Sequence, residues 1–86
     1  MVDSNQVSIE QIREWLKLGK AEGATHVVVF RDTFDGSTYP TNVMPGEDVK
    51  KIAFSDTSVM RKLVEVYNLD LNIEEQLREF RALNMK

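Results

Sequence analysis

Four consecutive apolar residues restrict what this chain can fold into more than any other feature of its sequence: Val27, Val28, Val29 and Phe30. A strand with one buried face alternates apolar and polar residues, whereas a strand buried on both faces is apolar throughout. β-Branched residues favour strands, so we expect a strand over residues 24–32. The rest of the fold must then cover both faces of this strand.

A second, weaker strand is expected over residues 37–44, because the turn signal Asp35-Gly36 separates it from the first. Pro40 has no N–H to donate, so the N–H side of this residue should face away from the sheet ladder. The two strands are therefore predicted to form an antiparallel hairpin in which the second strand is a sheet edge.

Helical signals flank the hairpin on both sides. Ser8 and Gln11 fit a capping box, which predicts a helix over residues 9–22. After the hairpin, acidic residues at the start of the segment 47–54 favour a short helix there, since a helix N-terminus attracts negative charge.

Two further helices are expected in the second half of the chain. The polar segment 55–58 can cap a helix that ends near Asn68. Its predicted inward-facing residues are Val59, Met60, Leu63, Val64 and Tyr67. Asn72 opens another capping pattern, which predicts a last helix. The apolar face of that helix would carry Ile73, Leu77, Phe80 and either Leu83 or Asn84.

These elements predict one α+β domain over residues 1–86: a helix, an antiparallel β-hairpin and then two or three helices. A two-stranded sheet is barely stable in water, and a chain without cysteine has no disulfide to support it. We therefore expect the small sheet to be completed or covered in a homodimer or a higher oligomer. In the alternative, the first and last helices cover the hairpin within a monomer.

Charge and hydropathy exclude several classes of partner. The chain carries 14 acidic and 11 basic residues and has no basic cluster, which disfavours binding to duplex DNA. No apolar run approaches the roughly 20 residues of a membrane helix, and the first residues lack the pattern of a signal peptide. The sequence therefore predicts a cytoplasmic protein that binds neither duplex DNA nor membranes.

The sequence predicts neither a catalytic site, nor a metal site, nor a cofactor. Asp32 and Asp35 suit a tight turn, and their spacing differs from that of a calcium-binding loop. His26 is the only histidine, so it has no second histidine or cysteine with which to bind a transition metal. A hydrolase that uses His26 with Asp32 is the least favoured hypothesis, because no nucleophile motif accompanies them.

Binding is better supported than catalysis. Arginine beside hydroxyl and aromatic side chains can hold a phosphate and stack on a base, which suits a small nucleotide. The predicted ligand-binding residues are Arg31, Thr33, Phe34, Tyr39, Thr41, Ser58 and Arg61. The same residue types also occur on solvent-exposed hairpins and at helix caps, so this structural interpretation stays open beside the functional one.

Several short motifs occur together: Gly-Ala-Thr-His at 23–26, Asp-Thr-Phe-Asp at 32–35, Tyr-Pro at 39–40 and Met-Pro-Gly-Glu-Asp at 44–48. With these motifs the chain resembles a family of short uncharacterised proteins of bacterial and phage genomes. The resemblance implies a phage or prophage accessory factor that acts by binding, for example by sequestering a host signalling nucleotide at or between the subunits of an oligomer. The alternative is a protein–protein interaction module that inhibits or adapts a host or phage protein through the acidic turn or the last helix.

Overall fold

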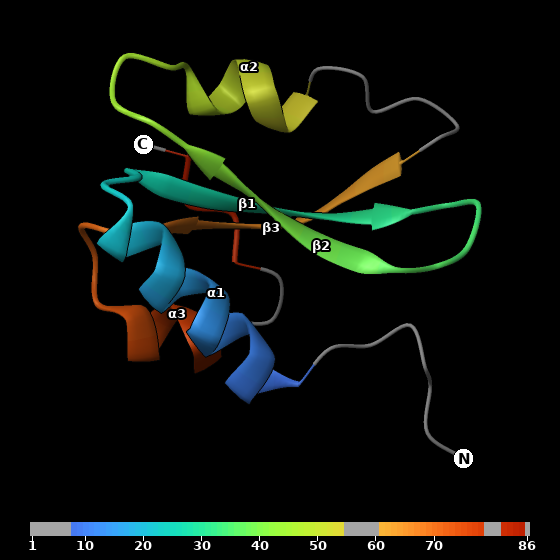
Figure 1. The fold of residues 1–86 in the computed structure, drawn as a ribbon, viewed down its shortest axis with the longest axis horizontal. Coiled ribbons are helices and arrows are strands. Elements are labelled where there is room, and N and C mark those ends of the chain that lie inside the picture. The colour runs from blue at the N-terminus through green and yellow to red at the C-terminus, as the bar shows by residue number, and fades with distance from the viewer. Residues whose placement is uncertain (1–7, 55–60, 79–81, 86) are drawn as a thin grey trace.

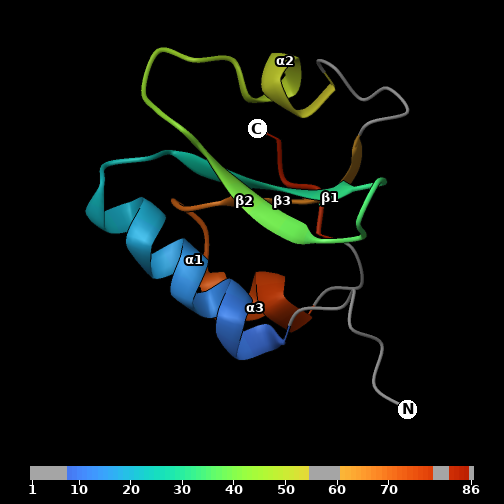
Figure 2. The same cartoon turned by 45° about the vertical axis from the view of Figure 1, so that its right-hand side comes forward.

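The computed structural model describes residues 8–54, 61–78 and 82–85 of the chain. Its elements, in chain order, are α1 (Ile9–Ala21), β1 (His26–Asp32), β2 (Thr38–Val43), α2 (Val49–Phe54), β3 (Arg61–Asn68) and α3 (Ile73–Arg78). The strands form an open three-stranded antiparallel sheet in the order β2-β1-β3, which confirms the α+β class. α1 and α3 lie on one face of this sheet and α2 lies on the other (Figures 1 and 2).

The apolar run occupies the central strand of the sheet, which explains why it does not alternate. Val27 and Val29 pack in a cluster with α1 and α3, whereas Val28 and Phe30 pack in a second cluster with α2. All four side chains are at most 1% exposed within a single chain. The expectation that a second copy is needed to cover them therefore loses its basis. Helices of one chain cover them, but the first and last helices share one face and α2 covers the other (Figure 1).

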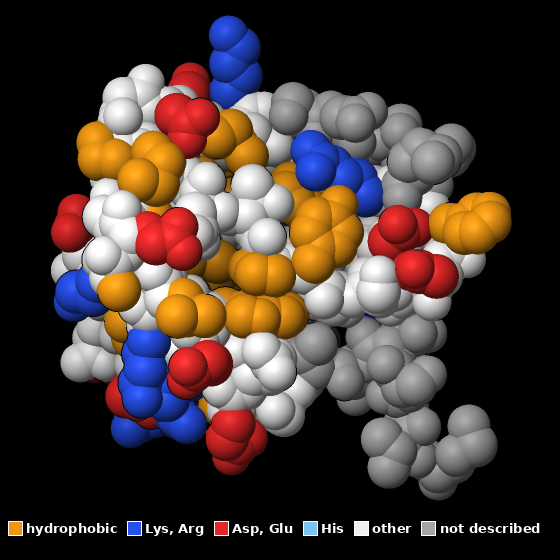
Figure 3. All heavy atoms as spheres, viewed as in Figure 1, with side chains coloured by type: hydrophobic (Ala, Val, Ile, Leu, Met, Phe, Trp, Pro, Cys, Tyr) orange, Lys and Arg blue, Asp and Glu red, His pale blue; other side chains and the backbone are white. Residues whose placement is uncertain are grey.

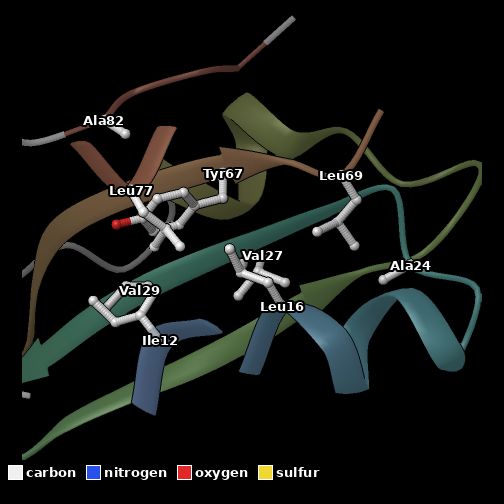
Figure 4. Close-up of a cluster of buried hydrophobic side chains, with 9 residues drawn as sticks. All are labelled: Ile12, Leu16, Ala24, Val27, Val29, Tyr67, Leu69, Leu77 and Ala82. Atoms are coloured by element: carbon white, nitrogen blue, oxygen red, sulfur yellow. The ribbon is translucent and has the colours of Figure 1, made fainter. Parts of the chain in front are cut away.

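The larger cluster lies between the sheet and the pair α1 and α3, as Figure 4 shows. Ile12 and Leu16 project from α1 toward the valines of β1, and Leu77 projects from α3. Its buried members are Ile12, Leu16, Ala24, Val27, Val29, Tyr67, Leu69, Leu77 and Ala82. Such interdigitated burial contributes roughly 1.5–3 kcal/mol for each large apolar side chain, which makes this layer the main support of the fold.

Residues 61–68 form β3, so the prediction of a helix ending near Asn68 is wrong. The adjacent apolar pair Leu63 and Val64 suits helical spacing, but it arises from a register shift opposite Val29 and Phe30. An irregularity of this kind interrupts the alternation that would have indicated a strand. The decisive factor is long-range, because β3 pairs with the otherwise open edge of β1. The predicted cap at 55–58, with Ser58, and the inward-facing Val59 and Met60 lie outside the described residues.

The predicted last helix is shorter than expected. α3 ends at Arg78, Phe80 lies outside the described residues, and Leu83 forms a parallel bridge with Val66. The Val66 N–H donates to the Ala82 carbonyl at 2.7 Å, and the Asn84 N–H donates to the Val66 carbonyl at 3.0 Å. The extended segment 82–84 therefore covers the outer edge of β3 instead of continuing the helix.

Gln76 of α3 covers the next part of the same edge. Its side-chain carbonyl accepts from the Asn68 N–H and its amide donates to the Asn68 carbonyl, both at 2.8 Å. Asn84 adds a third contact, because its side-chain amide donates to the same Gln76 oxygen at 2.8 Å. The Gln76 side chain is 2% exposed and thus replaces a neighbouring strand's peptide group at the end of β3.

The outer edge of β2 carries Pro40 in the orientation that the sequence predicts. The Asp32 N–H donates to the Ser37 carbonyl at 2.7 Å, so these two residues form a hydrogen-bonded pair of the antiparallel ladder. Such pairs alternate along the ladder, which makes Pro40, opposite Val29, a non-hydrogen-bonded pair. Its nitrogen therefore faces away from β1, and the edge lacks a donor at this position.

An ion pair joins the two helices that share a face of the sheet. Arg13 of α1 donates from Nε and Nη2 to the two carboxylate oxygens of Glu74 in α3, at 2.9 and 2.8 Å. These hydrogen bonds lower the pKa of Glu74. Within the described ranges, no helix is long and apolar enough to cross a membrane.

Gly19 allows α1 to approach β1 closely, and its replacement by alanine is expected to destabilise the domain. A Cβ atom there would lie 2.9 Å from Cγ2 of the buried Val27 and 3.1 Å from Oδ1 of Asn42. We expect the overpacking in Gly19→Ala to lower the free energy of unfolding by about 1–3 kcal/mol. The higher helix propensity of alanine offsets up to about 1 kcal/mol of this loss. Urea denaturation measures the change.

Lys20→Ala is the matched control, because Lys20 is exposed in the same turn of α1. This variant is expected to change stability by no more than about 0.5 kcal/mol. A Gly19→Ala protein at least as stable as the wild type would contradict the close packing of α1 on β1.

Candidate anion-binding site

Two basic residues meet at one end of the sheet. Arg31 of β1 and Lys62 of β3 are directly opposite each other in the antiparallel register. Residues directly opposite in such a pair project to the same face, and Arg31 shares its face with Val29, two residues before it. A cavity of about 260 Å³ opens here, lined by Arg31, Lys62, Leu63 and Val64.

The electrostatics of this pair are unfavourable without an anion. Like charges directly opposite on neighbouring strands repel each other. Within the described ranges neither Arg31 nor Lys62 forms an ion pair, and Nε of Arg31 is buried without a hydrogen-bond acceptor. A buried donor without a partner costs roughly 1–3 kcal/mol, so an anion bound between the two side chains would remove both penalties.

Three of the predicted ligand-binding residues lie on the opposite face of the sheet. Tyr39 and Thr41 are paired with Phe30 and Val28, whose side chains face α2. The Tyr39 ring lies against Phe30 with its centroid 5.9 Å away, and the Arg61 guanidinium lies 3.9 Å from the centre of the Phe30 ring. The structure therefore separates this aromatic and cationic group from Arg31.

Thr33 and Phe34 lie in the turn between β1 and β2, which hydrogen bonds hold in one shape. The Phe34 N–H donates to the Asp32 carboxylate at 2.7 Å, and the Gly36 N–H donates to the Asp32 carbonyl at 2.8 Å. The Ser37 N–H donates to the Asp35 carboxylate at 2.8 Å, which lowers the pKa of Asp35. Phe34 is 88% exposed and thus does not stack over the cavity of its own chain.

His26 and Asp32 are at opposite ends of β1. At about 3.3 Å per residue, the six steps between them span roughly 20 Å, too far for both to act on one bond. His26 is buried, and its Nδ1 lies 2.9 Å from the Thr25 hydroxyl, while the Asp32 carboxylate holds the turn. These two residues thus do not form the hydrolytic arrangement considered from the sequence.

Comparison of the chain with family models, with curated proteins and with solved structures found no match. The resemblance to short bacterial and phage proteins therefore stays a prediction.

Of the two cavity cations, only Arg31 is among the predicted ligand-binding residues. The sequence offers Lys62 only as a basic residue of a predicted helix, where nothing relates it to the hairpin. The pairing of β3 with β1 creates this site, and the register of two strands so far apart in the chain has no local signal. Strong β propensity at Val64, Val66 and Tyr67 is the one hint in the sequence that could have revealed the third strand.

Proposed function

We propose that this chain is a non-enzymatic cytoplasmic binding protein that holds a small phosphate-bearing ligand, such as a nucleotide, between Arg31 and Lys62. One observation carries the proposal: two opposed cations without an anionic partner in the described residues line a cavity, and one of them has a buried donor without an acceptor. Retention of such a ligand without turnover agrees with sequestration as the role.

The composition of the cavity wall supports this ligand class. The planar guanidinium of Arg31 suits two phosphate oxygens, while the Lys62 ammonium acts as a compact charge. The Val64 side chain, which packs beside the cluster under α1 and α3, gives an apolar wall for a sugar or a base, whereas the Leu63 side chain packs with Phe30 on the α2 face. The volume of about 260 Å³ lies just under the roughly 300–1,000 Å³ typical of drug-sized ligands, which favours a mononucleotide.

The net charge of −3 does not prevent anion binding. At physiological ionic strength, charges on an exposed surface are screened beyond about 8 Å. The two cations beside the ligand therefore outweigh the acidic residues that lie farther away. Glu65, which shares this face opposite Val29, accepts a hydrogen bond from the Ala82 N–H at 3.2 Å.

Titration calorimetry with mononucleotides, and with inorganic phosphate, tests the proposal. Loss of a hydrogen bond to a charged group costs about 1.5–3 kcal/mol, so Arg31→Ala and Lys62→Ala should each weaken binding about tenfold to a hundredfold. Thermal stability gives a second readout, since a ligand at 100 times its dissociation constant adds about 2.7 kcal/mol to the free energy of unfolding.

Lys50→Ala is the control, because Lys50 is exposed on α2, on the other face of the sheet. It is expected to leave the affinity unchanged. If millimolar nucleotide and phosphate neither bind nor stabilise the wild type, the proposal is wrong.

A protein–protein interaction module is the second candidate function. The exposed aromatic side chain of Phe34, presented by a hydrogen-bonded turn that carries acidic residues, favours it. Exposed aromatic side chains of this kind often anchor protein interfaces.

A further inference from the structure

We propose that the hairpin tip, residues 33–36 with Phe34 at its apex, inserts into the Arg31–Lys62 cavity of a second copy of the chain. Self-association and anion binding then compete for one cavity. The competition rests on the proposed function, whereas the self-association does not.

The hairpin tip has the properties of an interface anchor. Phe34 is 88% exposed, and the hydrogen bonds from the amides of Phe34, Gly36 and Ser37 fix the backbone that carries it. Binding through a preformed loop avoids much of the entropy cost of ordering. Figure 3 shows a hydrophobic side chain standing out from the end of the molecule where Figure 1 places the β1–β2 turn, with acidic side chains beside it.

The chemistry of the tip complements that of the cavity. The Phe34 ring is apolar, as is the Val64 side chain in the cavity wall. Asp35 carries a negative charge next to this ring, and the hydrogen bond from the Ser37 amide lowers the pKa of this carboxyl. This charge would meet the two cations of the cavity, which have no anionic partner within the described ranges.

The positions of tip and cavity allow a symmetric exchange. Arg31 directly precedes Asp32, at which the turn closes, so tip and cavity belong to the same end of the sheet. Two copies that meet at these ends about a twofold axis can each give one tip and receive one. The alternative dimer, formed by adding β2 to β2, is disfavoured because Pro40 removes a donor from that edge.

The exchange involves few side chains and thus less surface than the roughly 1,200–2,000 Å² of a stable interface. We expect a weak dimer with a dissociation constant on the order of hundreds of micromolar. Sedimentation equilibrium of the full chain in a phosphate-free buffer, up to about 1 mM, is the test. The mean mass should rise from 9.9 kDa toward twice that value.

Phe34→Ser should stay at 9.9 kDa throughout this range, and its circular dichroism should match that of the wild type because the residue is exposed. Phe54→Ser is the matched control, since Phe54 is an exposed phenylalanine on α2, and it should dimerise as the wild type does. A wild type that is monomeric at 1 mM, or a Phe34→Ser variant that still dimerises, overturns the inference.

A charge exchange tests which surfaces meet. Asp35→Arg should abolish dimerisation alone, because it places a basic tip against the two cations. The double variant Arg31→Glu/Lys62→Glu should also abolish it alone, because it places an acidic cavity against Asp35. An equimolar mixture of the two variants should form a heterodimer, since one copy's new basic tip meets the other's new acidic cavity and the second contact is unchanged. A mixture that stays monomeric although the wild type dimerises contradicts the pairing.

Ligand competition separates this inference from the proposed function. A mononucleotide at saturating concentration should return the wild type to 9.9 kDa. If the protein binds the nucleotide but never dimerises, the inference fails and the proposed function stands. If it dimerises through Phe34 but binds no nucleotide, the proposed function fails and only the self-association is supported. A dimer that binds nucleotide without dissociating overturns the competition.

Discussion

Replacement of Gln76 by leucine is expected to lower the free energy of unfolding by about 2–4 kcal/mol, because each buried polar group left without a partner costs about 1–3 kcal/mol. Leucine has a similar size but cannot pair with the N–H and the carbonyl of Asn68, both of which Gln76 satisfies at 2.8 Å. A chain of 86 residues has a total stability of roughly 4–13 kcal/mol, so the loss is a large part of it. Urea denaturation measures the change.

Two further variants make this prediction specific. Gln11→Leu alters an exposed glutamine of α1 and should change stability by about 0.5 kcal/mol at most. Gln76→Glu keeps the shape but has no donor for the Asn68 carbonyl when it is ionised. Burial raises the pKa of a carboxyl, so this variant should be relatively more stable at pH 4 than at pH 7, since the protonated group regains a donor. A Gln76→Leu protein with wild-type stability would show that the edge of β3 does not depend on this side chain.

Phe30→Ala is expected to cost about 3–5 kcal/mol, as is usual for the truncation of a buried aromatic residue. The Phe30 ring is fully buried, touches Tyr39 and lies beneath the Arg61 guanidinium. The cavity left behind would remove support from β2, β3 and α2 together. We expect loss of near-UV circular dichroism, or a fall in the denaturation midpoint large enough to leave the domain close to unfolding at 37 °C.

Phe34→Ala provides an internal control, because the same substitution is made four positions along the same hairpin. Phe34 is 88% exposed, and its backbone amide keeps its bond to Asp32 in the variant. The denaturation midpoint should therefore match that of the wild type. If Phe34→Ala and Phe30→Ala lower the denaturation midpoint equally, then the Phe34 ring is not exposed in solution while the Phe30 ring is buried.

Local signals predicted the first half of the fold well. The capping box at Ser8 gives the start of α1 at Ile9, and the Ser8 hydroxyl indeed accepts from the Gln11 N–H at 3.1 Å. The turn at Asp35-Gly36 and the edge position of Pro40 follow from backbone chemistry that acts over a few residues. Such features depend little on the rest of the chain, which is why the sequence predicts them.

The second half depends on contacts that the sequence does not reveal. Whether residues 61–68 become a helix or a strand is decided by the open edge of β1, and the register shift near Phe30 conceals the strand pattern. The end of α3 depends in the same way on the bridge between Leu83 and Val66. The sequence therefore predicts that the apolar run must be covered on both faces. It favours a second copy as the cover, whereas helices of the same chain supply it.

In the candidate site, too, local signals predict one residue and long-range strand pairing determines the other. Arg31 could be selected because the hairpin was predicted correctly, whereas Lys62 joins it only through the β1–β3 register. Tyr39 and Arg61 were grouped with Arg31 on residue type alone, and the alternation of side chains along a strand places them on the other face. Residue type thus suggested the chemistry, and strand pairing decided which groups meet.

β1 lies between β2, which is close to it in the sequence, and β3, which is distant in the sequence, and this difference sets the order in which the strands pair. β2 follows β1 through a short turn, whereas β3 joins only after α2 and residues 55–60. Closure of the longer loop is slower, so we expect the hairpin to form first and to leave its most hydrophobic strand temporarily unpaired along one side. During that interval, before Arg61–Asn68 docks, the nascent chain is most vulnerable to misassembly with its neighbours.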